Sequence, residues 1–288
     1  MQPLVSVFMP AYNAAGTIGP AIRSILSQTY ENFELIVVDD GSSDSTASIV
    51  ESFDDPRIVL VANPCNLKVA ISLNIAIDLA RGSYFARSDA DDLSMPGRFQ
   101  AQVEYLEAHP EVDALGTAMY FFNAQGEIIG GLQKSSDHGA LVRRMQWRIP
   151  IAQPTMMARA EWLRRYKYRP LYFRAEDRDL FFRSFRESRF ANMPQYLYAY
   201  RDPGRINLKK IYYTNYQVLI MRLRHWKEYG LPIRWVLGFP LIMAGRLVYY
   251  VMTAALGRSW LWSHMQPLPR TTALEKDQVW LSQCLQKG

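Results

Sequence analysis

Short apolar runs that alternate with helix-like segments are the feature of this sequence that most constrains its fold. Residues 4–9 (LVSVFM) and 33–38 (FELIVV) have strand length and are almost wholly apolar, and residues 17–28 between them place apolar side chains at helical spacing. The same alternation continues through residues 58–62, 69–80 and 83–87. Buried strands separated by helices of this kind predict a mostly parallel sheet with helices on both faces, and therefore an α/β fold.

Polar and acidic residues directly follow three of these strands. They are Tyr12, Asn13, Asp39, Asp40, Asp89, Asp91 and Asp92. Because the carboxyl ends of parallel strands meet at one edge of the sheet, where ligands bind, we expect these residues to lie close together. Clustered carboxylates repel one another and have no role in a core, so we interpret them as a ligand site. Carboxylates spaced like Asp89 and Asp91 can hold a hard divalent cation such as Mg²⁺ or Mn²⁺.

Other kinds of site find no support in the sequence. Neither the dinucleotide-binding glycine pattern nor a phosphate-binding Gly-Lys-Ser/Thr loop is present, which argues against dinucleotide enzymes and ATPases. The only cysteines, Cys65 and Cys284, are far apart, and the four histidines never fall at metal-ligand spacing, so neither a disulfide framework nor a zinc site is expected.

Past residue 110 the alternation loosens. We expect strands at 112–116, 119–122, 127–130 and 195–200, a turn at 123–126, and helices at 137–148 and 176–186. A change in charge then marks a boundary near residue 204. Residues 205–270 hold ten Lys or Arg and one acid, Glu228, whereas the rest of the chain has a net charge of −3. The predicted domains are 1–204, with halves 1–110 and 111–204, and a basic, aromatic, helical region at 205–288.

Residues 235–257 form an apolar stretch broken only by Arg246. Each half is too short to cross a bilayer, so we expect a re-entrant or interfacial hairpin; a single span and a buried helical pair are the alternatives. Flanking basic residues and four tryptophans favour contact with an anionic membrane surface over nucleic acid. Without a basic stretch leading into an apolar run at the N-terminus, no signal peptide is expected. The predicted location is the cytoplasmic face of the inner membrane.

Six segments in order resemble the motifs of family 2 glycosyltransferases, inverting enzymes with a GT-A fold, a Rossmann-like domain that binds nucleotide-diphospho-sugars. They are 5–13 (VSVFMPAYN), 33–42 (FELIVVDDGS), 66–74 (NLKVAISLN), 80–98 (ARGSYFARSDADDLSMPGR), 175–177 (AED) and 200–201 (YR). The resemblance implies that Tyr12 stacks on the nucleobase, that Asp39 accepts a hydrogen bond from it, and that Asp91 ligates Mg or Mn on the diphosphate. The implied nucleotide-sugar-binding residues are Pro10, Tyr12, Asn13, Asp39, Asp40, Lys68, Arg87, Asp89 and Arg201, and the implied metal ligands are Asp91 and Asp89.

Several of these assignments keep an alternative. Asp40 either caps the following turn or helps to hold the ribose, and Asp92 could instead fix its loop. Lys68 and Arg87 either contact phosphate or sugar or are solvated charges.

The resemblance also assigns the catalytic residues. Asp177 is the implied general base, which removes a proton from the acceptor hydroxyl, with Glu176 as its orienter. The alternative is that both are ordinary acids in the first turn of a helix.

Two departures from the family pattern concern histidines. Gln153 stands where relatives often have a histidine, and Asp202 follows Tyr200-Arg201 where another histidine is frequent. The second departure puts the metal affinity in doubt.

The expected function is metal-dependent, inverting transfer of a sugar from a UDP- or dTDP-sugar to a lipid-linked glycan acceptor in bacterial polysaccharide, lipopolysaccharide or capsule synthesis. Two alternatives remain, a partner subunit that binds nucleotide-sugar without catalysis and a sugar nucleotidyltransferase. The latter needs a glycine-rich loop with a basic residue after the first strand, and residues 10–16 (PAYNAAG) have neither.

Overall fold

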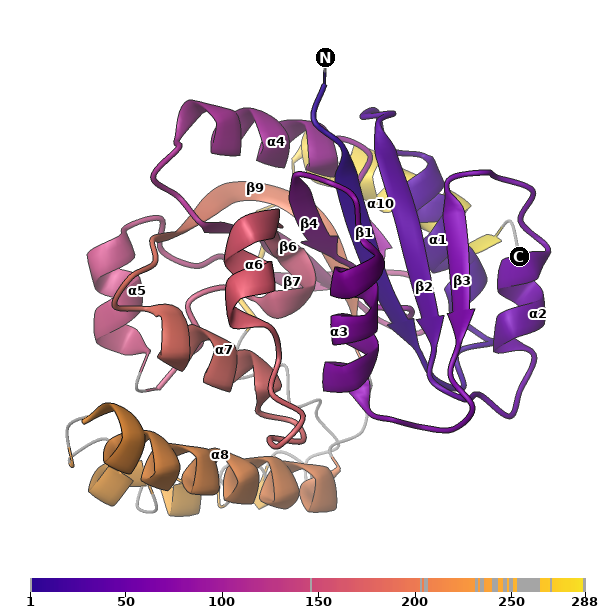
Figure 1. Ribbon diagram of the computed structural model, residues 1–288. Helices are drawn as coiled ribbons and strands as arrows, with labels where there is room; N and C mark the ends of the chain where they lie inside the picture. The colour runs from indigo at the N-terminus through magenta and orange to yellow at the C-terminus, as the bar shows by residue number, and fades with distance from the viewer. Residues whose placement is uncertain are drawn as a thin grey trace.

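The computed structural model describes residues 2–145, 147–202, 204, 207–230, 233, 236–239, 243–245, 248, 251–252, 265–269 and 271–286. Its strands form one mixed sheet in the order β3-β2-β1-β4-β8-β6-β9-β5, with β7 paired to β6 (Figure 1). The strands are β1 (Val5–Ala11), β2 (Phe33–Asp39), β3 (Ile58–Ala62), β4 (Tyr84–Arg87), β5 (Leu93–Ser94), β6 (Ala114–Phe122), β7 (Ile128–Leu132), β8 (Met157–Arg159) and β9 (Phe190–Arg201). The helices are α1 (Ile18–Leu26), α2 (Thr46–Glu51), α3 (Val69–Leu79), α4 (Arg98–Ala108), α5 (His138–Arg144), the 3₁₀ helix η1 (Gln153–Thr155), α6 (Ala160–Tyr166), α7 (Glu176–Ser184), α8 (Leu208–Tyr229) and α10 (Thr272–Gln286).

The first half of the chain forms the parallel part of the sheet, as the sequence predicts. Strands β3, β2, β1 and β4 are neighbours and run parallel. Their side chains alternate between two cores, so that Val7 and Met9 of β1 belong to one core and Phe8 to the other. The carboxyl ends of β1, β2 and β4 therefore meet at one edge, which carries the predicted ligand-binding residues.

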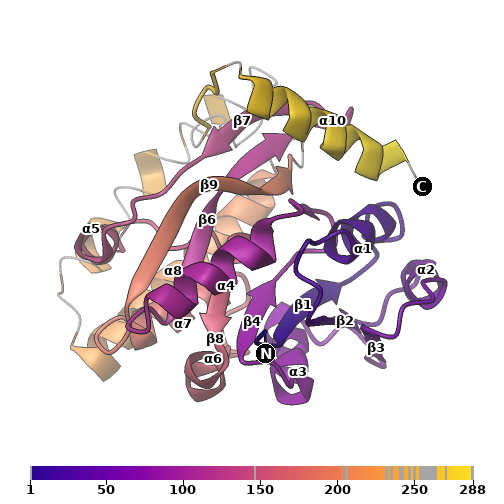
Figure 2. The ribbon, with the colours of Figure 1, turned by 90° about the horizontal axis from the view of Figure 1, so that it is seen from above.

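Helices cover both faces of this sheet (Figures 1 and 2). Helices α3, α6 and α7 pack on one face, where Leu73, Leu163 and Phe181 are fully buried. Helices α1 and α4 cover the other face, where Ile22 and Phe99 are buried. Two separate cores, one on each side of the strands, hold the sheet in place.

The second half departs from the sequence-based expectations. The strands predicted at 112–116 and 119–122 are one strand, β6, because it pairs with β9 along its whole length through two irregular positions. The strand predicted at 195–200 begins earlier, at Phe190. The helix predicted at 137–148 ends at Arg144 in α5, and the one at 176–186 ends at Ser184. The mostly parallel sheet is thus mixed beyond β4, where β8 pairs antiparallel.

Two helices of the C-terminal region predicted at 205–288 pack against the rest of the protein. Helix α8 contacts α7 through His225, whose Nε2 lies 2.7 Å from Oδ1 of the fully buried Asp179. Helix α10 packs on the sheet at β6 and β7, where Leu281 is buried beside Tyr120 and Phe122 (Figure 2). The domain boundary near residue 204 stays a prediction.

Most of the apolar hairpin predicted at 235–257 lies outside the described residues. Among the residues that are described, no helix combines the length and the apolar character that a membrane span requires.

Candidate active site

The loops after β1 and β2 are fastened to each other at the edge of the sheet. Asn13 adopts a left-handed backbone conformation, with φ of 49°, and its Oδ1 accepts hydrogen bonds from the amide and the hydroxyl of Ser43. Its own amide donates to Oγ of Ser42 over 2.8 Å, and that hydroxyl in turn donates to Asp39. The side chain of Tyr12, the residue before Asn13, is 52% exposed. The arrangement places an exposed aromatic ring at the strand end next to the buried Asp39, and the roles of both residues toward a nucleobase stay predictions.

Asp40 holds the next loop. Its two carboxylate oxygens accept from the amides of Leu67 and Lys68, each over 2.9 Å, and Oδ1 also accepts from Nδ2 of Asn63. The preceding turn passes through Gly41, whose φ is +73°; a Cβ there would come within 2.6 Å of the backbone of Cys65. Asp40 therefore supports the loop before α3, whereas the turn that follows Asp40 is held by Asp39, which accepts from the amide and the hydroxyl of Ser42. The contacts of Asp40 leave Lys68 exposed at the start of α3. A contact of Asp40 with ribose stays a prediction.

The acidic residues after β4 differ in burial and in their hydrogen bonds. Asp92 is fully buried and accepts from the hydroxyl of Tyr198 over 3.0 Å and from the amide of Arg201 over 2.9 Å. The Arg201 guanidinium donates to the carbonyl of Asp91. Asp91 itself is exposed, and its pKa is raised because its surroundings limit its solvation and because Asp89 lies close. Asp92 therefore fixes the loop, and Arg201 clamps it from β9.

A buried chain of hydrogen bonds connects Asp89 to the second half of the protein. Arg87, at the end of β4, donates to Oδ1 of Asp89 over 2.9 Å and also to Oε1 of Gln153. Gln153 in turn donates to the hydroxyl of Tyr168 over 2.8 Å. At the position where relatives of the resembled family often have a histidine, this chain thus uses an amide that orients Arg87.

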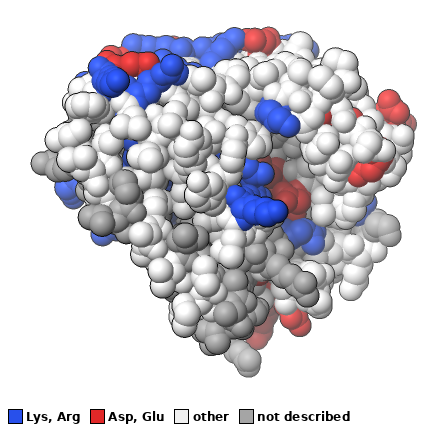
Figure 3. Space-filling view, turned by 90° about the horizontal axis from the view of Figure 1, so that it is seen from below, with Lys and Arg blue, Asp and Glu red and all other residues white. Residues whose placement is uncertain are grey.

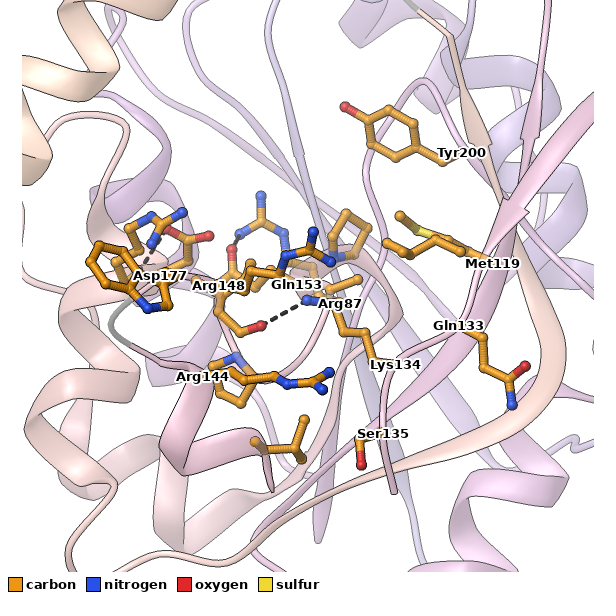
Figure 4. A pocket seen from close by; sticks show the side chains of 18 of the residues that line it. Arg87, Met119, Gln133, Lys134, Ser135, Arg144, Arg148, Gln153, Asp177 and Tyr200 are labelled. Carbon is orange, nitrogen blue, oxygen red and sulfur yellow. Dashed lines mark hydrogen bonds between the residues drawn. The ribbon is translucent and has the colours of Figure 1, made fainter. Parts of the chain in front are cut away.

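A cavity of about 460 Å³ opens beside Asp89, mainly between β6, β7, η1 and α7 (Figure 4). Glu176 and Asp177, at the start of α7, line it together with Arg87 and Asp89. Glu176 is buried, and its Oε2 has no hydrogen-bond partner among the described residues. Burial, and secondarily the neighbouring Asp177, raise the pKa of Glu176 to about 7. The structure therefore brings Asp89, of the first sequence-predicted acidic pair, to the same cavity as Glu176 and Asp177.

Basic side chains that sequence reasoning did not single out line the other wall of this cavity. Lys134 follows β7, and Arg144 and Arg148 flank the end of α5. Burial, with Arg178 and Arg148 nearby, lowers the pKa of Lys134 to about 7. The run at 143–148 (RRMQWR) was the available sequence signal, but only the fold places it against Asp177.

Comparison with known proteins assigns the family. The family model for Glycosyl transferase family 2 matches residues 6–167. The chain belongs to this family. It is 38% identical over 214 residues to an uncharacterized glycosyltransferase of Haemophilus influenzae, an alignment that covers 70% of this chain and 66% of the relative. It is also 38% identical to the putative glycosyltransferase EpsE of Bacillus subtilis, covering 69% of this chain and 73% of EpsE.

A shorter match concerns a relative with a named reaction. Over 103 residues, 36% of this chain and 41% of the relative, the glycosyltransferase is 42% identical to WfgD of Escherichia coli. WfgD is named a UDP-Glc:alpha-D-GlcNAc-diphosphoundecaprenol beta-1,3-glucosyltransferase. The match covers less than half of either protein.

Solved structures agree on the GT-A fold. TarS of Staphylococcus aureus, in complex with UDP-GlcNAc, has a TM-score of 0.63 at 19% identity and covers 82% of this chain and 71% of that structure. The mannosyltransferase PcManGT of Pyrobaculum calidifontis, with GDP-Man and Mn²⁺, has a TM-score of 0.62 at 19% identity and covers 99% and 85%. At this identity the likeness concerns the fold alone.

The residues at the sheet edge can be tested against the expected metal. The described residues contain no group of three or more metal-ligating side chains. A magnesium ion on a diphosphate takes one or two carboxylates, with phosphate and water oxygens completing its shell. Asp91 offers an exposed carboxylate that accepts from no described side chain, and the raised pKa that Asp89 helps to cause is one that a cation would lower. The donor set therefore fits a cation that arrives with its nucleotide.

Proposed function

We propose that this glycosyltransferase moves a sugar from a UDP- or dTDP-sugar to a lipid-linked glycan acceptor, with inversion and with Mg²⁺ or Mn²⁺, in bacterial polysaccharide assembly. The observation that carries the proposal is the cavity wall shared by Asp89, Glu176 and Asp177. It joins the edge expected to hold the donor diphosphate to the carboxylates expected to activate the acceptor. The solved complexes with UDP-GlcNAc and GDP-Man support the donor class, and the name of WfgD supports the acceptor class.

On the donor side, Tyr12 stacks on the base and Asp39 accepts from it, while Asp91, with Asp89, holds the cation. When bound, that cation neutralises the charge of the departing diphosphate. Arg87 fixes the carboxylate of Asp89 through a 2.9 Å hydrogen bond, so the metal-side carboxylate is held in position before the donor arrives.

On the acceptor side, Asp177 acts as the general base. Its Oδ1 accepts from the amide of Arg178 over 2.7 Å, which leaves the other oxygen to take a proton. As the acceptor hydroxyl loses that proton, its oxygen attacks the anomeric carbon and the nucleoside diphosphate leaves from the opposite face. Glu176 is buried next to this base, and burial, together with the charge of Asp177, raises the pKa of Glu176. A single displacement of this kind inverts the anomeric centre.

We further propose that α8 meets the cytoplasmic surface of the membrane. Its buried residues, such as Val218 and Met221, face the protein, whereas Tyr212, Tyr216 and Ile220 recur at four-residue spacing on the opposite side and are 66%, 50% and 40% exposed. Exposed basic residues on the helix include Lys209, Arg224 and Lys227. An aromatic stripe with basic neighbours suits an anionic leaflet. On the face seen from below, much of the described surface around a charged central hollow is uncharged (Figure 3).

Donor hydrolysis in the absence of acceptor tests the reaction. Nucleoside diphosphate release would be measured for UDP-, dTDP- and GDP-sugars, with and without Mn²⁺ or Mg²⁺, in the parent and in the Asp91→Ala and Asp177→Asn variants. Asp54→Ala, which removes an exposed carboxylate in the loop after α2, is the matched control. We expect metal-dependent release from one donor that is lost in Asp91→Ala and kept in Asp54→Ala. Binding of a donor without turnover under any condition would favour the partner-subunit alternative.

A further inference from the structure

The cavity beside Asp177 carries more positive charge than the sugar chemistry described above uses. Of the described residues that line it, five are basic and three are acidic. Arg87 is already bound to Asp89, but Lys134, Arg144 and Arg148 belong to the wall away from the donor edge. They extend toward the middle of the cavity, opposite Met119 and Tyr200 (Figure 4).

Two of these cations have no counter-ion in the described part of the chain. Arg144 and Arg148 are exposed, and no described carboxylate lies within ion-pair distance of either. Their neighbour Arg143 lies 3.7 Å from Asp137, outside the cavity lining. The Nζ of Lys134 donates to the carbonyl of Ile149 over 2.7 Å, which holds the amine in the wall. Burial next to other cations lowers the pKa of Lys134, and a bound anion would reverse this effect.

The same cavity has apolar walls. Trp147 and Ile149 line it near the cations, and Met119, Phe121 and Leu132 add further apolar side chains from the neighbouring strands β6 and β7. A ligand that satisfies both features carries concentrated negative charge next to a hydrocarbon or sugar face. An arginine pair is well suited to phosphate oxygens, because each guanidinium can donate two hydrogen bonds to them.

We propose that Lys134, Arg144 and Arg148 form an anion subsite for the diphosphate of the acceptor, an amphiphile whose sugar hydroxyl reaches Asp177. The inference rests on the proposed function, which places the donor diphosphate at Asp89 and Asp91 on the opposite side of the site. It adds that the enzyme recognises the linkage between glycan and lipid, beyond the terminal sugar.

The first experiment uses farnesyl diphosphate as the probe, because it carries the diphosphate and an apolar chain without any sugar. Isothermal titration calorimetry, with saturating UDP and Mg²⁺ to fill the donor site, would compare the parent protein with Arg144→Ala, Arg148→Ala and Arg148→Lys. Arg143→Ala is the control with the same change of charge, one residue away and outside the cavity. Circular dichroism would verify that each variant is folded.

We expect each alanine variant to weaken binding about tenfold, as the loss of a charge-assisted hydrogen bond predicts. Arg148→Lys should recover part of that loss, and Arg143→Ala should bind as the parent does. Equal losses in Arg143→Ala and Arg144→Ala would overturn the proposal, because they would indicate a diffuse charge effect. Binding of farnesyl diphosphate that is seen only when UDP is left out would also overturn it, because UDP would then be displacing the probe from the donor site. So would a parent protein that does not bind the probe at all.

The second experiment separates this inference from the proposed function. The acceptor KM would be measured for an alkyl GlcNAc diphosphate and for the alkyl glycoside of the same sugar. The inference predicts that Arg144→Ala raises the first KM about tenfold more than the second. If the parent hydrolyses no donor but binds farnesyl diphosphate as above, the proposed function fails while the anion subsite stands. If donor turnover occurs and both KM values change equally, the inference fails while the function stands.

Discussion

Glu176 should make the stability of this protein depend on pH. Burial and the nearby Asp177 raise its pKa from 4.5 to about 7 in the folded state. One pKa unit corresponds to about 1.4 kcal/mol, so ionising Glu176 in the folded protein lowers the free energy of unfolding by roughly 3 kcal/mol. Because the folded pKa is raised, the folded state binds the proton more tightly, and stability falls as pH rises from about 4.5 through 7. Below that window the carboxyl is protonated in both states, and the effect vanishes.

Glu176→Gln removes the titration and keeps the shape of the side chain. We expect the variant to gain stability over the parent between pH 5 and pH 8, with a difference that grows to roughly 3 kcal/mol and then levels off. Urea unfolding in the presence of a chelator, at intervals of half a pH unit, would measure it. The Oε2 of Glu176 has no hydrogen-bond partner that the substitution could remove. The amide therefore changes the free energy of unfolding by an amount that is the same at every pH, and the slope of the stability difference with pH is the diagnostic quantity.

Glu161→Gln is the matched control, since Glu161 also lies in the first turn of a helix, α6, but is exposed. A difference between parent and Glu176→Gln that is the same at pH 5 and pH 8 would refute the reasoning. It would mean that the carboxyl is solvated or paired in solution. The same substitution should reduce transfer activity, so a variant that is more stable and less active would show that this carboxylate is kept at the site at the expense of stability.

Three further predictions concern other parts of the molecule. Asp179→Ala should lower the free energy of unfolding by about 3–5 kcal/mol in urea titrations at pH 7, because it leaves Arg183 and the buried His225 without their carboxylate; a loss below about 1 kcal/mol would contradict this. Tyr12→Ala should raise the donor KM by about tenfold or more through lost stacking, and Tyr12→Phe should not; equal effects of both would argue against stacking. Replacing Tyr212 and Tyr216 by serine should weaken flotation with phosphatidylglycerol vesicles about tenfold, and unchanged flotation would remove α8 from the membrane contact.

The polar edge of the sheet at the ends of β1, β2 and β4 was predictable from sequence because its parts are local. Each loop follows its own strand within a few residues, and period-two and helical spacing place the strand ends without knowledge of the rest of the chain. Tyr12, Asp39 and Asp89 therefore fall where the motifs predict. The role of Asp92 in fixing its loop was among the predicted alternatives, and the hydrogen bonds from Tyr198 and Arg201 favour it. Asp40 was expected to cap the turn after it, but it accepts instead from the amides of the distant Leu67 and Lys68.

The remainder of the site depends on contacts between distant parts of the chain. Gln153 meets Arg87 across 66 residues, and the buried Arg98 donates to the carbonyl of Arg87 from α4, a helix that the sequence pattern did not reveal. Lys134 and Arg148 look like ordinary surface charges in the sequence, and they become a site only because β7 and α5 border the same cavity. The sequence predicted two strands where the structure has β6 for the same reason, because the continuity of β6 depends on its pairing with the distant strand β9.

The packing of α10 has a practical consequence for preparing shorter forms of this protein. The apolar stretch at 235–257 invites removal by ending the chain after α8, but that cut would also discard residues 272–286. Tyr120 would lose the hydrogen bond of its hydroxyl to Asp277, Ile128 would lose the one from its amide to Gln278, and Leu281 would no longer cover Phe122. A form intended to stay in solution therefore calls for an internal deletion that reconnects α8 to α10 through a flexible linker. Helix α10 covers the sheet at β6 and β7, so a shortened form should retain it.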